Sequence, residues 1–161
     1  MPKEPTVKRL TAVLGLLLLA VAAPVWGQCG AGMQKLGEAE RAAIIRPALD
    51  YAESYYEGDG AKMERALHPD LAKRLVQTDA QGRPRLDHMS AMRLVQIIRT
   101  GGGKNIPAER QQKDVAILDV YNGKIASLRV EMDGWVDYLH VGKFGDRWLI
   151  VNVLWEPKPR P

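Results

Sequence analysis

The sequence of 161 residues contains one cysteine, Cys29, and three histidines. A single cysteine excludes an internal disulfide and a metal site built from several thiolates. The histidines lack the His-x-x-x-His type of spacing that binds zinc from one helix face. We therefore expect no metal site.

Motifs for nucleotide and acyl chemistry are also missing. The run from Gly101 to Lys104 resembles a phosphate loop only in composition, because it follows a predicted helix and lacks the Gly-Lys-Ser/Thr ending. The sequence contains no Gly-x-Ser-x-Gly and no dinucleotide fingerprint. We therefore expect no cofactor.

A strong excess of charge of one sign is absent as well. The formal net charge is +4, and removal of the first 27 residues leaves 20 basic and 18 acidic side chains. So weak a balance does not favour a nucleic acid or a membrane surface as partner. A composition of 46% hydrophobic and 26% charged residues is typical of a globular domain.

One long apolar run is present, from Leu10 to Val25, and it follows a short basic segment. This is the pattern of a signal peptide, and the run is shorter than the about 20 residues that a spanning helix needs. We expect cleavage after Gly27 and export to the periplasm or the medium, with an uncleaved anchor as the alternative. Because Gln28 rather than a small residue precedes Cys29, we do not expect lipid anchoring.

The remaining chain begins with a glycine-rich segment over 28–37, which we expect to be flexible. Apolar spacing and capping residues predict helices over 38–57, 59–67 and 91–99. Between the last two helices, residues 71–88 indicate two short extended pieces around a turn. Pro47 lies inside the first helix, where it marks either a kink or the first ordered turn.

The period of the apolar residues changes to two after Lys113. It predicts strands at 113–121, 124–133, 135–144 and 147–155, joined by two-residue hairpin signals such as Asn122-Gly123. Helices followed by strands predict one α+β domain over 38–156, with the helices on one face of a strongly curved antiparallel sheet. The tail from Glu156 to Pro161 holds three prolines, so we do not expect it to extend the sheet.

Four stretches in this order resemble the nuclear-transport-factor-2-like (NTF2-like) superfamily, in particular its branch called putative lumazine-binding or SnoaL-like. They are Tyr51–Asp59, Ala66–Leu71, Asp137–Val141 and Arg147–Trp155. The resemblance covers residues 38–156 and implies three helices packed on a cone-shaped sheet. It implies no single function, because this fold serves isomerases, dehydratases, cyclases, binding modules and assembly domains.

The resemblance makes Tyr51 and Asp137 the candidate catalytic residues. Ketosteroid-isomerase-like members use a tyrosine at this place on the first helix and a neutral, buried aspartate on the penultimate strand to stabilise an enolate. The general base that they need would fall near Leu75, which cannot take a proton. Dehydratase-like members use histidine with aspartate, but alternation places His140 and Asp137 on opposite faces of their strand. We therefore do not expect catalysis, although the question stays open.

Aromatic residues on the last strands suggest a pocket for a flat apolar ligand. Strict alternation groups Trp148 with Asn152 on one face, and Trp155 with Val153 on the other. The candidate ligand-binding residues are Tyr51, Tyr55, Trp135, Asp137, Trp148 and Asn152. Two alternatives remain open for these residues. The first is an ion pair of Asp137 with Arg129, and the second is a place for the tryptophans in the core or in a dimer contact.

Three functions remain open from the sequence. The first is an exported, non-catalytic domain that binds a small apolar molecule or a partner and forms a homodimer through the sheet. The second is an enzyme of isomerase or dehydratase type that uses Tyr51 and Asp137. The third is a purely structural dimer, with an interface made by an apolar sheet face. That face would carry Tyr138, Val151, Val153 and Trp155.

Overall fold

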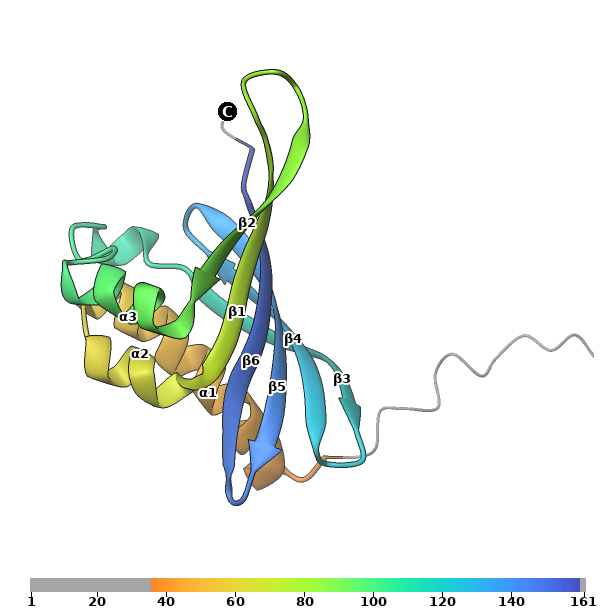
Figure 1. The fold of residues 1–161 in the computed structure, drawn as a ribbon. Coiled ribbons are helices and arrows are strands. Elements are labelled where there is room, and N and C mark those ends of the chain that lie inside the picture. Colours follow the sequence, from red (N-terminus) through yellow and green to blue (C-terminus); the bar gives the residue numbers. More distant parts are fainter. Residues whose placement is uncertain (1–35, 160–161) are drawn as a thin grey trace, which may run out of the picture.

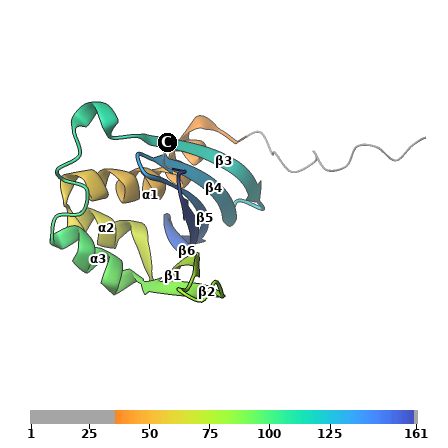
Figure 2. The ribbon, with the colours of Figure 1, turned by 90° about the horizontal axis from the view of Figure 1, so that it is seen from above.

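The structure, a computed structural model, describes residues 36–159. Three helices lie on one side of a curved six-stranded sheet (Figures 1 and 2). They are α1 (Glu38–Glu57), α2 (Gly60–Ala66) and α3 (Ala91–Arg99), as the sequence predicted to within a residue at most boundaries. No helix among residues 36–159 is both long and apolar enough to cross a membrane. The predicted signal peptide and Cys29 lie outside the described residues.

The sheet has the order β2-β1-β6-β5-β4-β3. Its strands are β1 (Leu67–Thr78), β2 (Pro84–Ser90), β3 (Lys113–Tyr121), β4 (Ile125–Met132), β5 (Trp135–Phe144) and β6 (Arg147–Pro157). The last four form the predicted antiparallel meander. The sheet as a whole is mixed rather than antiparallel, because β1 runs parallel to β6. The β1–β2 hairpin extends beyond the neighbouring strands (Figure 1).

Local sequence explains the main chain reversals. Asn122 and Gly123 both have positive φ, 53° and 60°, as a two-residue hairpin turn with the twist of its strands requires. Helix α1 passes through the buried Pro47 and ends at Gly58, which has φ of 69°. Both turns are therefore determined by residues that tolerate the left-handed region.

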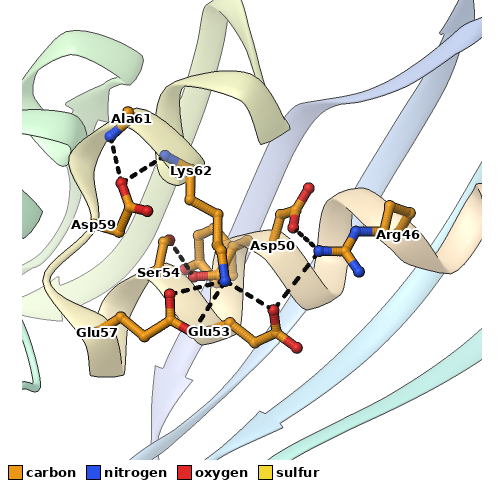
Figure 3. Close-up of polar contacts among 9 residues, drawn as sticks. Arg46, Asp50, Glu53, Ser54, Glu57, Asp59, Ala61 and Lys62 are labelled. Atoms are coloured by element: carbon orange, nitrogen blue, oxygen red, sulfur yellow. Dashed lines mark hydrogen bonds and ion pairs between the residues drawn. The ribbon is translucent and has the colours of Figure 1, made fainter.

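Polar contacts fix α2 against α1 (Figure 3). The Asp59 carboxylate accepts hydrogen bonds from the backbone N–H groups of Ala61 and Lys62, at 3.0 and 2.9 Å, and so begins α2. Both N–H donors lower the pKa of Asp59, and the donor from Lys62 has the larger effect. The Lys62 ammonium contacts Glu53 and Glu57 on the exposed side of α1. As a result, the opposite side of α1 is held toward the sheet.

A β-bulge in β6 changes which residues point to the helices. Val141 pairs with Ile150 and His140 pairs with Asn152, so Val151 is an extra residue between them. Trp148 and Ile150 before the bulge, and Val153 and Trp155 after it, consequently share the helix-covered face. The sequence-based grouping, which assumed strict alternation, was wrong at this point.

Two further expectations are corrected at the same end of the sheet. Val153 is fully buried, with 0% exposure, and therefore cannot belong to an exposed interface. The first two residues of the tail do extend the sheet: Glu156 pairs with Val136, and Pro157 pairs with Trp135. Proline is tolerated there because it is the final residue of the strand.

Candidate functional site

A pocket of about 200 Å³ lies between the helices and the inner face of the sheet. Residues from all three helices and from β1, β2, β5 and β6 contribute to its wall. They are Tyr51, Tyr55, Met63, Lys73, Met89, Leu94, Ile97, Ile98, Trp135 and Trp155. All but Lys73 are apolar or aromatic, so the amine of Lys73 is the charged group of this lining.

A buried polar network centred on Asp137 lies behind the lining of the pocket and reaches the lining through Tyr51, Lys73 and Trp135. The Asp137 carboxylate has 0% exposure and accepts three hydrogen bonds. Its Oδ1 accepts from the Lys73 ammonium, with which it forms an ion pair. Its Oδ2 accepts from the Tyr51 hydroxyl at 3.2 Å and from the Trp135 indole N–H at 2.7 Å. The donors come from α1, β1 and β5, so the network connects these three elements of the fold.

Lys73 is the member of this network that β1 supplies. Leu71, Lys73 and Leu75 alternate on the buried face of the strand. The Nζ atom of Lys73 also donates to the Tyr51 hydroxyl at 2.6 Å, and it lies 4.8 Å from the ring centre of Trp155. The Asp137 carboxylate, the Tyr51 hydroxyl and the face of the Trp155 ring together replace the water that a lysine ammonium loses on burial.

Burial shifts the proton affinity of two groups in the network. It lowers the pKa of Lys73, and the charge of Asp137 opposes that change. Burial also raises the pKa of Tyr51 well above its ordinary value of 10.0, and the neighbouring Asp137 carboxylate adds to the increase. At neutral pH Tyr51 is therefore a protonated hydrogen-bond donor.

Three aromatic rings form one wall of the pocket. The ring of Trp135 meets Tyr55 edge to face at a centroid distance of 4.8 Å, and Trp155 at 6.2 Å. Gly103 packs directly against the other side of Tyr55, and a Cβ atom at this position would overlap the Tyr55 ring. The absence of a side chain at Gly103 thus allows Tyr55 to keep its place beside Trp135.

A protein-family model described as "putative lumazine-binding" matches residues 39–156. The chain belongs to this family. Solved NTF2-like proteins share its fold at low sequence identity. A comparison with curated proteins gives no match.

Three of the solved structures illustrate the relationship, and all are NTF2-like proteins of unknown function. The protein from Silicibacter pomeroyi has 21% identity and a TM-score of 0.56, over 76% of this chain and 100% of the other. That from Shewanella baltica has 18% identity and a TM-score of 0.55, over 76% and 96%. That from Methylobacillus flagellatus has 18% identity and a TM-score of 0.56, over 78% and 97%.

In this member of the putative lumazine-binding family, four of the predicted site residues lie together. Tyr51, Tyr55 and Trp135 line the pocket, and Asp137 accepts hydrogen bonds from Tyr51 and Trp135 behind this lining. Lys73, which sequence reasoning missed, contacts both Tyr51 and Asp137. The signal that could have found it is its place between Leu71 and Leu75 on an alternating strand.

The other two predicted ligand-binding residues lie elsewhere. Trp148 is buried near Pro47 and Arg147, beside a separate groove. Asn152 points away from the helices, where its Oδ1 accepts a hydrogen bond from Arg74 at 2.7 Å. The bulge at Val151 accounts for the position of Asn152, because it turns the residues after it to the opposite face.

The structure also corrects the expected partners of Asp137. Arg129 pairs with Glu131 at 2.7 Å and not with Asp137. Both Asp137 oxygens accept hydrogen bonds, so the carboxyl is not placed as the neutral donor that ketosteroid-isomerase-like chemistry needs. His140 is exposed on the opposite face, as predicted. Leu75 is buried, and it does not line the pocket.

Proposed function

We propose that this domain is a non-catalytic binding module for a small, flat, mainly apolar molecule. The observation that carries the proposal is the pocket between the helices and the sheet, whose lining is apolar or aromatic except for the amine of Lys73. Its volume of about 200 Å³ is below the roughly 300–1,000 Å³ that is common for drug-sized ligands. The ligand would therefore be a molecule of one or two rings.

The state of the polar groups supports binding rather than catalysis. A general base must be free to take a proton from the substrate. Both oxygens of Asp137 already accept hydrogen bonds, and the Tyr51 hydroxyl is engaged by Lys73 and Asp137. An isomerase or dehydratase that uses Tyr51 and Asp137 remains the alternative, and it would require this network to rearrange.

Calorimetric titration with a flat two-ring compound tests the proposal. Lumazine, which the family description suggests, and naphthalene-1-sulfonate serve as ligands. Ile97 and Ile125 are both partly exposed, at 37% and 57%, and only Ile97 lines this pocket. We expect Ile97→Trp to abolish the binding heat and the matched control Ile125→Trp to preserve it. Binding by neither compound, or binding unaffected by Ile97→Trp, would overturn the proposal.

We also propose that the protein is exported. The support is the basic segment and apolar run that end before Gly27. Fractionation of an exporting bacterial host, with mass spectrometry of the product, should find a chain that begins at Gln28 and carries no lipid on Cys29. A full-length chain in the membrane fraction would instead support an uncleaved anchor.

We also propose that the domain forms a homodimer through the outer face of the sheet, with contact residues that differ from those the sequence suggested. Tyr138 and Leu154 are direct neighbours on β5 and β6, and they are 51% and 48% exposed. Apolar surface of this kind favours contact with a second chain. These two residues, rather than Val153 and Trp155, are the ones to change in a test of the interface.

A further inference from the structure

We propose that Lys73 is a nucleophilic amine that forms an imine with a small aromatic aldehyde held in the pocket. The inference rests on the proposed function, since it names the ligand class of the same pocket. The inference starts from the position of Lys73, which no other described lysine shares. The side chain of Lys73 is buried and also lines the pocket.

The hydrogen bonds of Lys73 leave part of the amine available to a ligand. Of its three N–H bonds, one is directed to Asp137 and a second to the Tyr51 hydroxyl. Residues 36–159 provide no hydrogen-bond acceptor for the third, and Nζ itself lies 4.8 Å from the ring centre of Trp155 at the pocket wall. A carbonyl oxygen in the pocket can accept this hydrogen bond, which brings the carbonyl carbon close to Nζ.

The surroundings of Lys73 also favour the neutral, reactive form of the amine. Burial lowers the pKa of Lys73, as expected for an ammonium group that has lost its water. The other residues that line the pocket are apolar or aromatic and offer no charged group to hold water beside the amine. The groups that face the amine are Tyr51 from α1, Asp137 from β5 and Trp155 from β6.

The step balances without any additional reactant. The Lys73 ammonium passes a proton to the Asp137 carboxylate, and the free amine adds to the carbonyl carbon to form a C–N bond. Asp137 returns that proton to the former carbonyl oxygen. A second proton moves from nitrogen to the same oxygen, which leaves as water. The product is a protonated imine, so the positive charge beside Asp137 is kept and nothing is oxidised or reduced.

Reductive trapping tests this inference on the full chain. Benzaldehyde has one ring and fits the size of the pocket, and cyanoborohydride delivers hydride to an imine carbon to give a stable benzyl amine. Peptide mapping by mass spectrometry then locates the benzyl group. Three exposed lysines, Lys104, Lys124 and Lys143, serve as internal references. We expect more modification at Lys73 than at any of these three lysines, because burial lowers the pKa of Lys73 and so enlarges the fraction of neutral amine.

Two variants test whether the labelling of Lys73 depends on the pocket. Lys73→Met should remove the preferred adduct. Because this variant leaves Asp137 without its partner and can unfold, Ile97→Trp provides a second test. It keeps Lys73 but narrows the pocket, so labelling of Lys73 should fall while that of Lys143 stays constant. The control Ile125→Trp should label Lys73 like the parent protein.

The outcomes separate this inference from the binding function. Equal labelling of all lysines, or labelling of Lys73 that Ile97→Trp does not change, would refute imine formation. If benzaldehyde quenches the fluorescence of the pocket tryptophans without adduct formation, the pocket binds aldehydes but Lys73 is not a nucleophile. If there is neither quenching nor an adduct, and lumazine also fails to bind, both proposals are wrong.

Discussion

The Nζ atom of Lys73 lies 2.6 Å from the hydroxyl oxygen of Tyr51, although 22 residues separate the two in sequence. Lys73 comes from β1 and Tyr51 from α1, and both contact the Asp137 carboxylate on β5. The hydroxyl accepts from the lysine and donates to the aspartate. The three side chains therefore form a closed polar unit within an apolar core, and each depends on the other two.

Removal of the lysine alone should be costly. In Lys73→Met, the fully buried Asp137 carboxylate loses its counter-charge, and such a loss costs about 3–5 kcal/mol in the free energy of unfolding. The double variant Lys73→Met with Asp137→Asn removes both charges. We expect its cost to be well below the sum of the two single costs. Urea unfolding of the three variants measures this, and additive costs would contradict the assigned ion pair.

The raised pKa of Tyr51 predicts how stability changes in alkaline solution. Above its ordinary value of 10.0, the unfolded chain releases this proton while the folded chain keeps it, so the free energy of unfolding falls as pH rises. The lowered pKa of Lys73 gives the opposite slope, but only up to about 10.5, its ordinary value. Above that pH, the parent protein should lose up to about 1.4 kcal/mol more per pH unit than Tyr51→Phe. Parallel slopes in urea unfolding would show that Tyr51 ionises normally in the folded protein.

The bulge at Val151 predicts opposite results for two adjacent residues of β6. Val153→Glu places a charge in the core without a partner and should unfold the domain. Leu154→Glu changes a residue that is 48% exposed and should alter the free energy of unfolding by no more than about 0.5 kcal/mol. If the domain dimerises through its outer face, Leu154→Glu should also produce monomers in analytical ultracentrifugation. Similar stability losses for both variants would contradict the described register.

The contact of Gly103 with Tyr55 predicts that a single methyl group can disturb the pocket. In Gly103→Ala the new Cβ overlaps the Tyr55 ring, which must move away from Trp135. We expect a shift in tryptophan emission and weaker binding of lumazine. Gly134→Ala is the matched control, because a Cβ at that position meets nothing within 4 Å. Unchanged emission and binding in Gly103→Ala would contradict the idea that Gly103 holds Tyr55 in place at the pocket.

Most of the fold could be predicted because its signals are local. Asp59 and Ser90 begin helices through their own side chains, and Asn122-Gly123 forms a hairpin turn by itself. The parallel pairing of β1 with β6 depends instead on contacts between distant parts of the chain. The bulge at Val151 also has no local signal, since neither glycine nor proline marks it.

The candidate site could be predicted in part. The aromatic residues of the sequence indicated Tyr55 and Trp135, which line the pocket. The resemblance to known families indicated two polar members of the site. Tyr51 and Asp137 were found in this way, and the structure places them in contact. The resemblance does not indicate Lys73, because on β1 it indicates only a general base near Leu75, two residues further along the same face. A charged residue between two buried leucines should have raised the question of its partner.

The place of β6 in the sheet has a consequence for the order of folding. It lies between β1 and β5, yet it is the last strand of the described chain to be synthesised. Until the residues of β6 that pair with β1, from Ile150 to Leu154, have left the ribosome, the hairpin of β1 and β2 has no strand through which to join the meander. The nascent chain therefore stays without its complete core during most of translation. A polypeptide that must be threaded through a translocase before it folds would benefit from such a delay.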